Sequence, residues 1–243
     1  MVTTPLPLKV TWQKLPDDYV LPDDPVDNIN QPPLAAALTD SLAQADRLPA
    51  TALTPTNYAI CATLDGKLAV KAPDWAYVPH LSVPRAEVVR SYTPQLQGDL
   101  PVVVMEFLSD TDGAEYSVKP TYPPGKWFFY EQVLCVPTYA LFNLADDALE
   151  VYRLSQGGRY QLQTPNAEGR YWLPEMALFL GVWVGSRDNR EGGWLRWWDE
   201  SGNLLLWSVE AAAQERQRAE QECQRAERLA AQLRAAGIEP DDA

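Results

Sequence analysis

Residues 102–110 have the sequence VVVMEFLSD. Val102 to Met105 are four consecutive apolar residues, a pattern typical of a strand that is buried on both faces of a sheet. The next residue is Glu106, and a lone buried carboxylate is costly in free energy unless it is paired or neutralised. We therefore expect Glu106 to have a cation, a bound proton or an exit to solvent at the end of this strand.

The segment after this strand predicts a helix and then a second strand. In KWFFYEQVLCV, residues 126–136, the apolar side chains of Trp127, Tyr130, Val133 and Leu134 recur at helical spacing, and Pro137 marks the end of the helix. TYALFNL, residues 138–144, is again strand-like. A strand, helix, strand order predicts two parallel strands joined by a crossover.

Hairpins are expected on both sides of this unit. NYAICATL and KLAVKA flank Asp65-Gly66, a pair that suits a two-residue turn. Later, we expect LEVYRL to pair with RYQLQT and WLRWW to pair with LLLW, so that hairpins extend the sheet on its later side. A helix is predicted from Leu34, in LAAALTDSLAQADRL, ending before Pro49.

These patterns predict a mixed α/β fold with three parts. Residues 1–32 form a Pro/Asp-rich arm, residues 33–207 form a core sheet flanked by helices with C-terminal hairpins, and residues 208–243 form a long charged helix. Ala212, Ala219, Ala226 and Leu233 recur every seven residues in that helix. Charged residues interrupt the seam, so a self-associating coiled coil and a solvated helix both stay open.

Composition excludes several classes of protein. The 243 residues carry a formal charge of −13, which argues against a tight, non-specific nucleic-acid binder. No stretch approaches the length of a bilayer-spanning helix, and we expect a cytoplasmic protein. The three cysteines form no metal-ligand pattern, and the chain lacks a phosphate-binding loop and a nucleophile-elbow motif.

Asp74 and Glu106 are the candidate site residues. Each lies at the edge of a predicted strand, and the loop between them is long enough to return the chain to an adjacent strand. Two carboxylates could then face one another. Paired acids with a nearby lysine suit a magnesium-dependent phosphodiesterase, because Mg²⁺ prefers oxygen ligands.

Several short motifs together resemble one family. They are Pro73-Asp74, then Glu106-Phe107-Leu108-Ser109, then Lys126 opening a helix with Tyr130, and Val136-Pro137-Thr138-Tyr139 leading into a strand. In this order they resemble the Uma-type restriction-endonuclease-like family of the PD-(D/E)XK nuclease superfamily, over approximately residues 33–180. The resemblance implies a restriction-endonuclease-like core sheet.

The resemblance also implies roles for individual residues. Asp74 and Glu106 would bind Mg²⁺, or Mn²⁺, together with the backbone carbonyl of Phe107. The superfamily places a lysine two residues after the glutamate, where this chain has Leu108. Lys126 is assigned that role instead.

Three further residues are weaker candidates on the same grounds. Lys119 and Lys71 are the alternatives to Lys126 for the catalytic lysine. Asp40 is the candidate for the acid that the family often places on its first helix.

Each assignment has a structural alternative. Asp74 could bind backbone amides at a turn, as aspartates after prolines commonly do. Glu106 could form a buried ion pair with Lys126 or with an arginine, without any metal. Lys126 could be a solvated residue in the first turn of a helix.

Two hypotheses on function follow. The first is a metal-dependent endonuclease that hydrolyses DNA phosphodiester bonds, acting on duplex DNA as a homodimer through the sheet edge or the helical tail. The same site chemistry would also serve RNA or branched DNA. The second is a catalytically inactive relative that acts as an interaction or oligomerisation module.

Overall fold

The computed structural model describes residues 8–20, 28–108 and 113–236. The chain divides into two compact units, Met1–Leu205 and Leu206–Ala243, and each is described by itself. Much of the predicted arm at 1–32, and Ser109 of the family motif, lie outside the described residues. The predicted limits of the three parts stay predictions.

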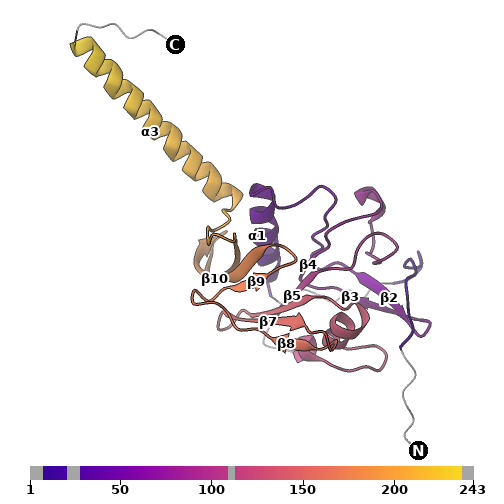
Figure 1. Ribbon diagram of the computed structural model, residues 1–243. Helices are drawn as coiled ribbons and strands as arrows, with labels where there is room; N and C mark the ends of the chain where they lie inside the picture. Colours follow the sequence, from indigo (N-terminus) through magenta and orange to yellow (C-terminus); the bar gives the residue numbers. More distant parts are fainter. Residues whose placement is uncertain (1–7, 21–27, 109–112, 237–243) are drawn as a thin grey trace, which may run out of the picture. The chain divides into compact units, whose positions relative to one another are not determined.

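A five-stranded sheet forms the centre of the first unit (Figure 1). Its order is β4-β5-β6-β7-β8, from the strands β4 (Trp75–Tyr77), β5 (Val103–Leu108), β6 (Thr138–Asn143), β7 (Ala148–Leu154) and β8 (Tyr160–Leu162). β5 and β6 are parallel, and the other pairs are antiparallel. The mixed α/β fold and the parallel neighbour of β5 are therefore confirmed.

The crossover between β5 and β6 contains the predicted helix in an unusual form. After the 3₁₀ turn η2 (Gly113–Tyr116), one α-helical turn, α2 (Lys126–Phe128), continues as the π-helical turn η3 (Phe129–Val133). Phe129 and Tyr130 are fully buried and belong to the core cluster. π-Helical turns occur often at functional sites.

A second sheet has the order β1-β2-β3. The hairpin of β2 (Ile60–Leu64) and β3 (Lys67–Lys71) turns at Asp65 and Gly66, whose φ angles are +47° and +81°, as the sequence predicts. β1 (Val10–Thr11) pairs with β2, so a part of the predicted arm belongs to this sheet.

The third sheet corrects one prediction. β11 (Arg190–Trp198) contains WLRWW and pairs with β10 (Leu178–Arg187), which also pairs with β9 (Tyr171–Leu173). The predicted pairing of WLRWW with LLLW is realised only in part: Leu204 and Trp198 form an isolated antiparallel bridge, and the Leu205 amide donates to the Trp197 carbonyl over 2.9 Å. Asp188 and Asn189 form the tight turn of this hairpin without a glycine, and this sheet is separate from the central one.

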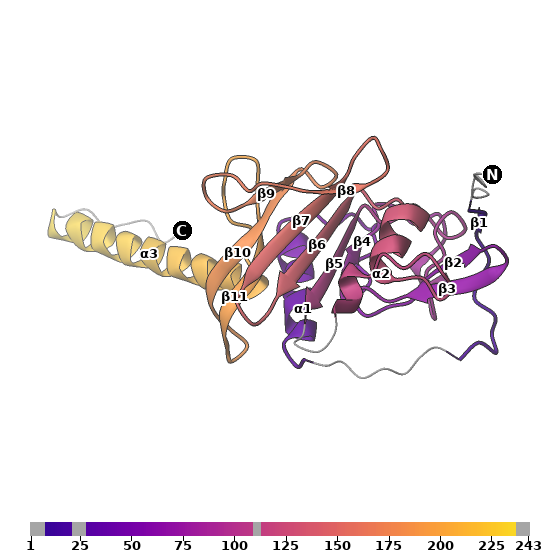
Figure 2. The same ribbon diagram turned by 90° about the horizontal axis from the view of Figure 1, so that it is seen from below.

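The first helix, α1 (Gln31–Gln44), packs against β11 (Figure 2). The indole of Trp197 donates to the Leu38 carbonyl over 3.1 Å, and the indole of Trp75 donates to the Thr39 hydroxyl over 2.9 Å. The two tryptophan rings lie 5.7 Å apart between their centroids. They link α1 to strand β4, which begins directly after Asp74.

Two further helical segments complete the structure. The 3₁₀ turn η1 (Arg85–Glu87) follows the loop after β4, and α3 (Ser208–Ala235) forms most of the second unit. Every described side chain of α3 is at least partly exposed. Among the described residues, no helix is both long enough and apolar enough to cross a membrane.

Candidate active site

The register of β4 and β5 brings Asp74 and Glu106 together. Trp75 pairs with Met105 in this antiparallel pair, so one further step places Asp74 opposite Glu106. Residues directly opposite each other point to the same face of a sheet. Asp74 Oδ2 also accepts a hydrogen bond from the Phe107 amide over 2.6 Å. The two predicted acids thus share one end of the central sheet.

Glu106 is completely buried, and two polar side chains from the crossover contact its carboxyl group. Oε1 accepts a hydrogen bond from the Tyr130 hydroxyl over 2.9 Å, and Oε2 lies 3.0 Å from Lys126 Nζ. Both partners come from the crossover that joins β5 to β6. The structure therefore provides the cation that the buried carboxylate requires.

Lys126 lies between two carboxylates. Its Nζ is 3.0 Å from Glu106 Oε2 and 3.2 Å from Glu115 Oε1, and its side chain is 25% exposed. The other oxygen of Glu115 is buried and has no hydrogen-bond partner among the described residues. Glu115 lies in η2, within a polar and proline-containing segment whose sequence gives no periodic signal, and our sequence analysis missed it.

Burial governs the protonation of the two acids. Desolvation raises the pKa of Glu106 to about 8, although Lys126 and Tyr130 lower it in part. Desolvation also raises the pKa of Asp74, against the lowering effects of the Phe107 amide and Lys126. Glu106 therefore takes up a proton more readily than an ordinary glutamate does.

Lys126 stays charged. Burial lowers the pKa of its ammonium group, but the Glu106 and Glu115 carboxylates raise it by more, so the net pKa lies above the ordinary value. The site thus combines a permanent cation with acids that bind protons readily. A second cation in the site would displace the Glu106 proton.

The backbone of Phe107 has a partner from α1. The Gln31 side-chain amide donates to the Phe107 carbonyl over 2.7 Å, and Gln31 is buried. Asp40, the acid considered on this helix, forms an ion pair with Arg187 over 3.1 Å. α1 therefore contributes Gln31 to the end of the sheet that carries Asp74 and Glu106. Asp40 pairs with Arg187 of β10 instead.

The two alternative lysines differ in their environment. Lys71, at the end of β3, is partly buried, and desolvation and then the Lys126 charge lower its pKa while Glu106 raises it. Lys119 is exposed but also acts electrostatically on Lys71. Lys71 therefore lies within electrostatic range of Lys126, Glu106 and Lys119, in a chain whose net charge is negative.

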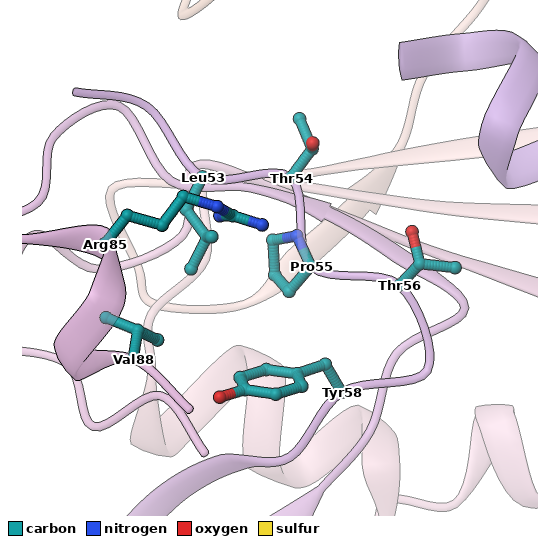
Figure 3. Close-up of a pocket in the computed structure, with 7 residues that line it drawn as sticks. All are labelled: Leu53, Thr54, Pro55, Thr56, Tyr58, Arg85 and Val88. Atoms are coloured by element: carbon teal, nitrogen blue, oxygen red, sulfur yellow. The ribbon is translucent and has the colours of Figure 1, made fainter. Parts of the chain in front are cut away.

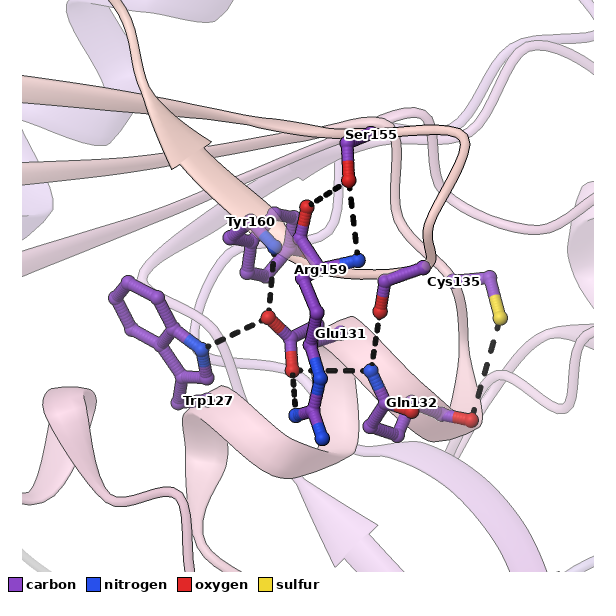
Figure 4. Close-up of polar contacts among 8 residues, drawn as sticks. Trp127, Glu131, Gln132, Cys135, Ser155, Arg159 and Tyr160 are labelled. Carbon is purple, nitrogen blue, oxygen red and sulfur yellow. Dashed lines mark hydrogen bonds and ion pairs between the residues drawn. The ribbon is translucent and has the colours of Figure 1, made fainter.

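A network centred on Glu131 fixes the π-helical turn in place (Figure 4). Glu131 Oε1 accepts from the Tyr160 amide over 2.7 Å and from the Trp127 indole over 3.3 Å. Oε2 accepts from the Arg159 guanidinium over 2.9 Å. Glu131 thereby ties the helix that carries Lys126 and Tyr130 to the hairpin of β7 and β8.

The oxygen atoms of Asp74, Glu106 and Phe107 are of the type that hard divalent cations prefer. Their arrangement is not a complete protein cage, since no group of three or more His, Cys, Asp or Glu side chains in the described ranges is placed to hold a metal ion. Two carboxylates and a carbonyl fit an ion that keeps several waters, as Mg²⁺ does.

The structure also contains two of the contacts that would give Asp74 and Glu106 purely structural roles. Asp74 does accept a backbone amide, and Glu106 does pair with Lys126. Lys126, by contrast, is only 25% exposed, so it is not a freely solvated helix residue. These contacts are compatible with a metal site, because the same oxygens have further lone pairs.

Comparison with known families gives a match over most of the first unit. The model of the Uma2 family, described as "Putative restriction endonuclease", matches residues 27–187, more than half of the chain. The matched region contains Asp74, Glu106, Phe107 and Lys126. No curated protein matches the chain.

Proposed function

The chain belongs to the Uma2 family, and on this basis we propose that it is a metal-dependent endonuclease that hydrolyses DNA phosphodiester bonds. One observation carries the proposal. Asp74, Glu106 and Lys126 come from three separate segments and converge at one end of the central sheet, with Lys126 Nζ 3.0 Å from Glu106 Oε2. A buried acid pair with a lysine is a costly arrangement that structural stability alone does not require.

The carboxylates of Asp74 and Glu106 would hold the metal, with the Phe107 carbonyl as a third protein oxygen. A bound Mg²⁺ or Mn²⁺ supplies a nucleophilic water at neutral pH and neutralises phosphate charge. The Tyr130 hydroxyl orients the Glu106 carboxyl group. The Lys126 ammonium would then face the phosphate or the attacking water, where it offsets developing negative charge.

The charges around the site suit a phosphodiester substrate. Lys71 adds positive charge within electrostatic range of Lys126, and Lys119 acts on Lys71 in turn, while the chain as a whole is acidic. We expect weak DNA binding, since few cations are available to contact the backbone phosphates, and we expect it to weaken further as salt rises because these contacts are electrostatic. Cleavage of both strands of a duplex would require two such sites, which a two-fold dimer through the sheet edge or α3 would supply.

The test is cleavage by the purified full-length protein with Mg²⁺ or Mn²⁺ at low salt. Supercoiled, linear and single-stranded DNA would be compared, with RNA and branched DNA as further substrates. Asp74→Asn and Glu106→Gln are expected to abolish cutting while circular dichroism stays unchanged. Glu168→Gln removes an exposed acid on a loop and is expected to cut as the parent protein does.

A second candidate function has its own support. The Phe107 carbonyl is engaged by Gln31, Lys126 is held by two carboxylates, and Leu108 occupies the usual lysine position. These contacts also suit an inactive relative that acts as an interaction module, with α3 as the interacting element. Calorimetry that detects no Mg²⁺ or Mn²⁺ binding, together with no cleavage of any substrate, would favour this second function.

A further inference from the structure

A pocket lies away from the acid pair, on the loop that precedes β2 (Figure 3). Its volume is about 280 Å³, and its lining residues are Leu53, Thr54, Pro55, Thr56, Tyr58, Arg85 and Val88. Pockets for drug-sized ligands start near this size, so a ligand here would have roughly the size of a single nucleotide or less.

The walls of the pocket are suited to a flat ring. Tyr58 and Pro55 lie on opposite sides of the space, and Val88 and Leu53 add apolar surface (Figure 3). Aromatic side chains are the usual platforms on which nucleic-acid bases stack. A planar ring entering between Pro55 and Tyr58 would therefore cover apolar surface on both of its faces.

The Tyr58 side chain offers its ring to a ligand in the pocket, because its hydroxyl is closed off from solvent. The Tyr58 hydroxyl is buried and makes no hydrogen bond within the described residues. Desolvation raises the pKa of this phenol, so the group remains a neutral donor and acceptor.

Arg85 supplies a cation at the same pocket. Its side chain is exposed on η1, and none of the salt bridges found among the described residues involves it. Its guanidinium group can therefore bind an anion without first breaking an ion pair seen in the described residues. Its planar fork matches the geometry of a phosphate.

We propose that this pocket binds a nucleoside monophosphate unit, with the base between Pro55 and Tyr58 and the phosphate on Arg85. The unit is either a free nucleotide or one nucleotide of a nucleic-acid strand, since both present the same ring and the same anion. The proposal does not rest on the nuclease function, because none of the lining residues belongs to the acid pair or its lysine.

The pocket is physically joined to the strand that positions Asp74. The Ala76 amide donates to the Pro55 carbonyl over 3.0 Å, and the Asn57 amide donates to the Pro73 carbonyl over 2.9 Å. Leu53 and Val78 form a two-way backbone bridge. A nucleotide in the pocket would thus contact the loop that is bonded on both sides of Asp74.

The test is calorimetric titration of the full-length protein with the four deoxynucleoside 5′-monophosphates in the presence of EDTA. The chelator removes any contribution from divalent ions, so the result is independent of nuclease activity. We expect saturable binding of at least one nucleotide, and the same affinity in Asp74→Asn. Inorganic phosphate is expected to bind much more weakly, because it lacks the ring.

Two variants test the named contacts. Arg85→Gln is expected to weaken nucleotide binding about tenfold or more, because it removes a charge-assisted hydrogen bond to phosphate. Tyr58→Leu removes the aromatic platform and is expected to weaken binding about fivefold or more. Arg228→Gln, which removes an exposed arginine of α3, is the matched control and is expected to change nothing.

The proposal is overturned if no nucleotide binds saturably, if inorganic phosphate binds as tightly as the nucleotides, or if Arg85→Gln binds as the parent protein does. A single-stranded oligonucleotide then separates the two sources. Competition that depends on Arg85 identifies a nucleotide within a strand, whereas a nucleotide that the oligonucleotide does not displace identifies a free nucleotide. Both results uphold the proposed chemistry.

Discussion

Glu106 Oε2 and Lys126 Nζ lie 3.0 Å apart, with the carboxylate completely buried and the lysine side chain 25% exposed. The pair connects the central strand β5 to the crossover that follows it. Removing one partner from a buried ion pair is usually strongly destabilising, because a charge is left without compensation. Here the consequence differs, because Glu106 can take up a proton instead of remaining charged.

The first prediction concerns Lys126→Met. The variant keeps the length and packing of the side chain but removes its charge, so cleavage is expected to fall by about a factor of 100 or more. Its folding stability near neutral pH is expected to change little, since Glu106 is then held in its protonated form. The measurements are single-turnover cleavage and denaturant unfolding.

Three other lysine substitutions serve as comparisons for this variant. Lys71→Met and Lys119→Met are expected to weaken DNA binding more than they slow the cleavage step. Lys9→Met removes an exposed charge and is expected to have no effect. Cleavage at the parental rate by Lys126→Met would remove Lys126 from the site and leave Lys71 as the candidate.

The second prediction concerns the pH dependence of metal binding. Because the pKa of Glu106 is about 8, a divalent ion that binds its carboxylate must displace a proton below that pH. Apparent Mg²⁺ affinity is therefore expected to rise about tenfold between pH 6 and pH 7 and to level off above about pH 9.

Calorimetry in two buffers of different ionisation enthalpy would count the protons released. We expect about one proton per bound ion at pH 7 and none at pH 9.5. Glu106→Gln is expected to bind Mg²⁺ much more weakly, and its remaining Mg²⁺ affinity is expected not to show this dependence on pH. Mg²⁺ affinity that stays constant from pH 6 to pH 8 would mean that Glu106 is not a ligand.

The sequence alone predicted the elements that carry the acid pair. The apolar run before Glu106 and the crossover after it predicted the parallel strands β5 and β6, and the position of Asp74 before a strand predicted a second carboxylate nearby. These features depend on local pattern and on short connections, which sequence periodicity records well.

The contacts that our sequence analysis missed depend on long-range packing. Gln31 reaches Phe107 across 76 positions of the chain, and nothing in the local sequence distinguishes it from a solvated residue at a helix start. Glu115 precedes Lys126 by 11 positions in a loop without periodicity. The hairpin of β10 and β11 was missed because Asp188-Asn189 is a weaker turn signal than a pair with glycine.

The third prediction concerns the stability of Glu106→Gln without metal. The pKa of Glu106 is about 8 in the folded protein and 4.5 in its ordinary state. Because folding raises this pKa, the contribution of Glu106 to the free energy of unfolding is fully present below pH 4.5 and is lost as the pH rises through about 8. A glutamine side chain cannot ionise, so the variant avoids this loss.

Glu106→Gln is therefore expected to match the parent protein near pH 4.5 and to be more stable by about 2–5 kcal/mol at pH 9, in EDTA. Urea unfolding across this pH range measures the difference. Glu168→Gln, at an exposed position, is expected to show a difference that does not depend on pH. If the stability difference between Glu106→Gln and the parent protein did not change with pH, the raised pKa of Glu106 would be contradicted.

The fourth prediction concerns Gln31→Leu, which removes the amide that donates to the Phe107 carbonyl over 2.7 Å. The carbonyl loses a buried hydrogen-bond partner, so the free energy of unfolding in EDTA is expected to fall by about 1–3 kcal/mol. If this carbonyl is a metal ligand, Gln31 competes with the metal, and the variant is expected to bind Mg²⁺ a few-fold more tightly. Gln44→Leu changes an exposed residue at the other end of α1 and should alter neither quantity. Lower stability with unchanged Mg²⁺ affinity would show that the Phe107 carbonyl only anchors α1, and that Asp74 and Glu106 act without it.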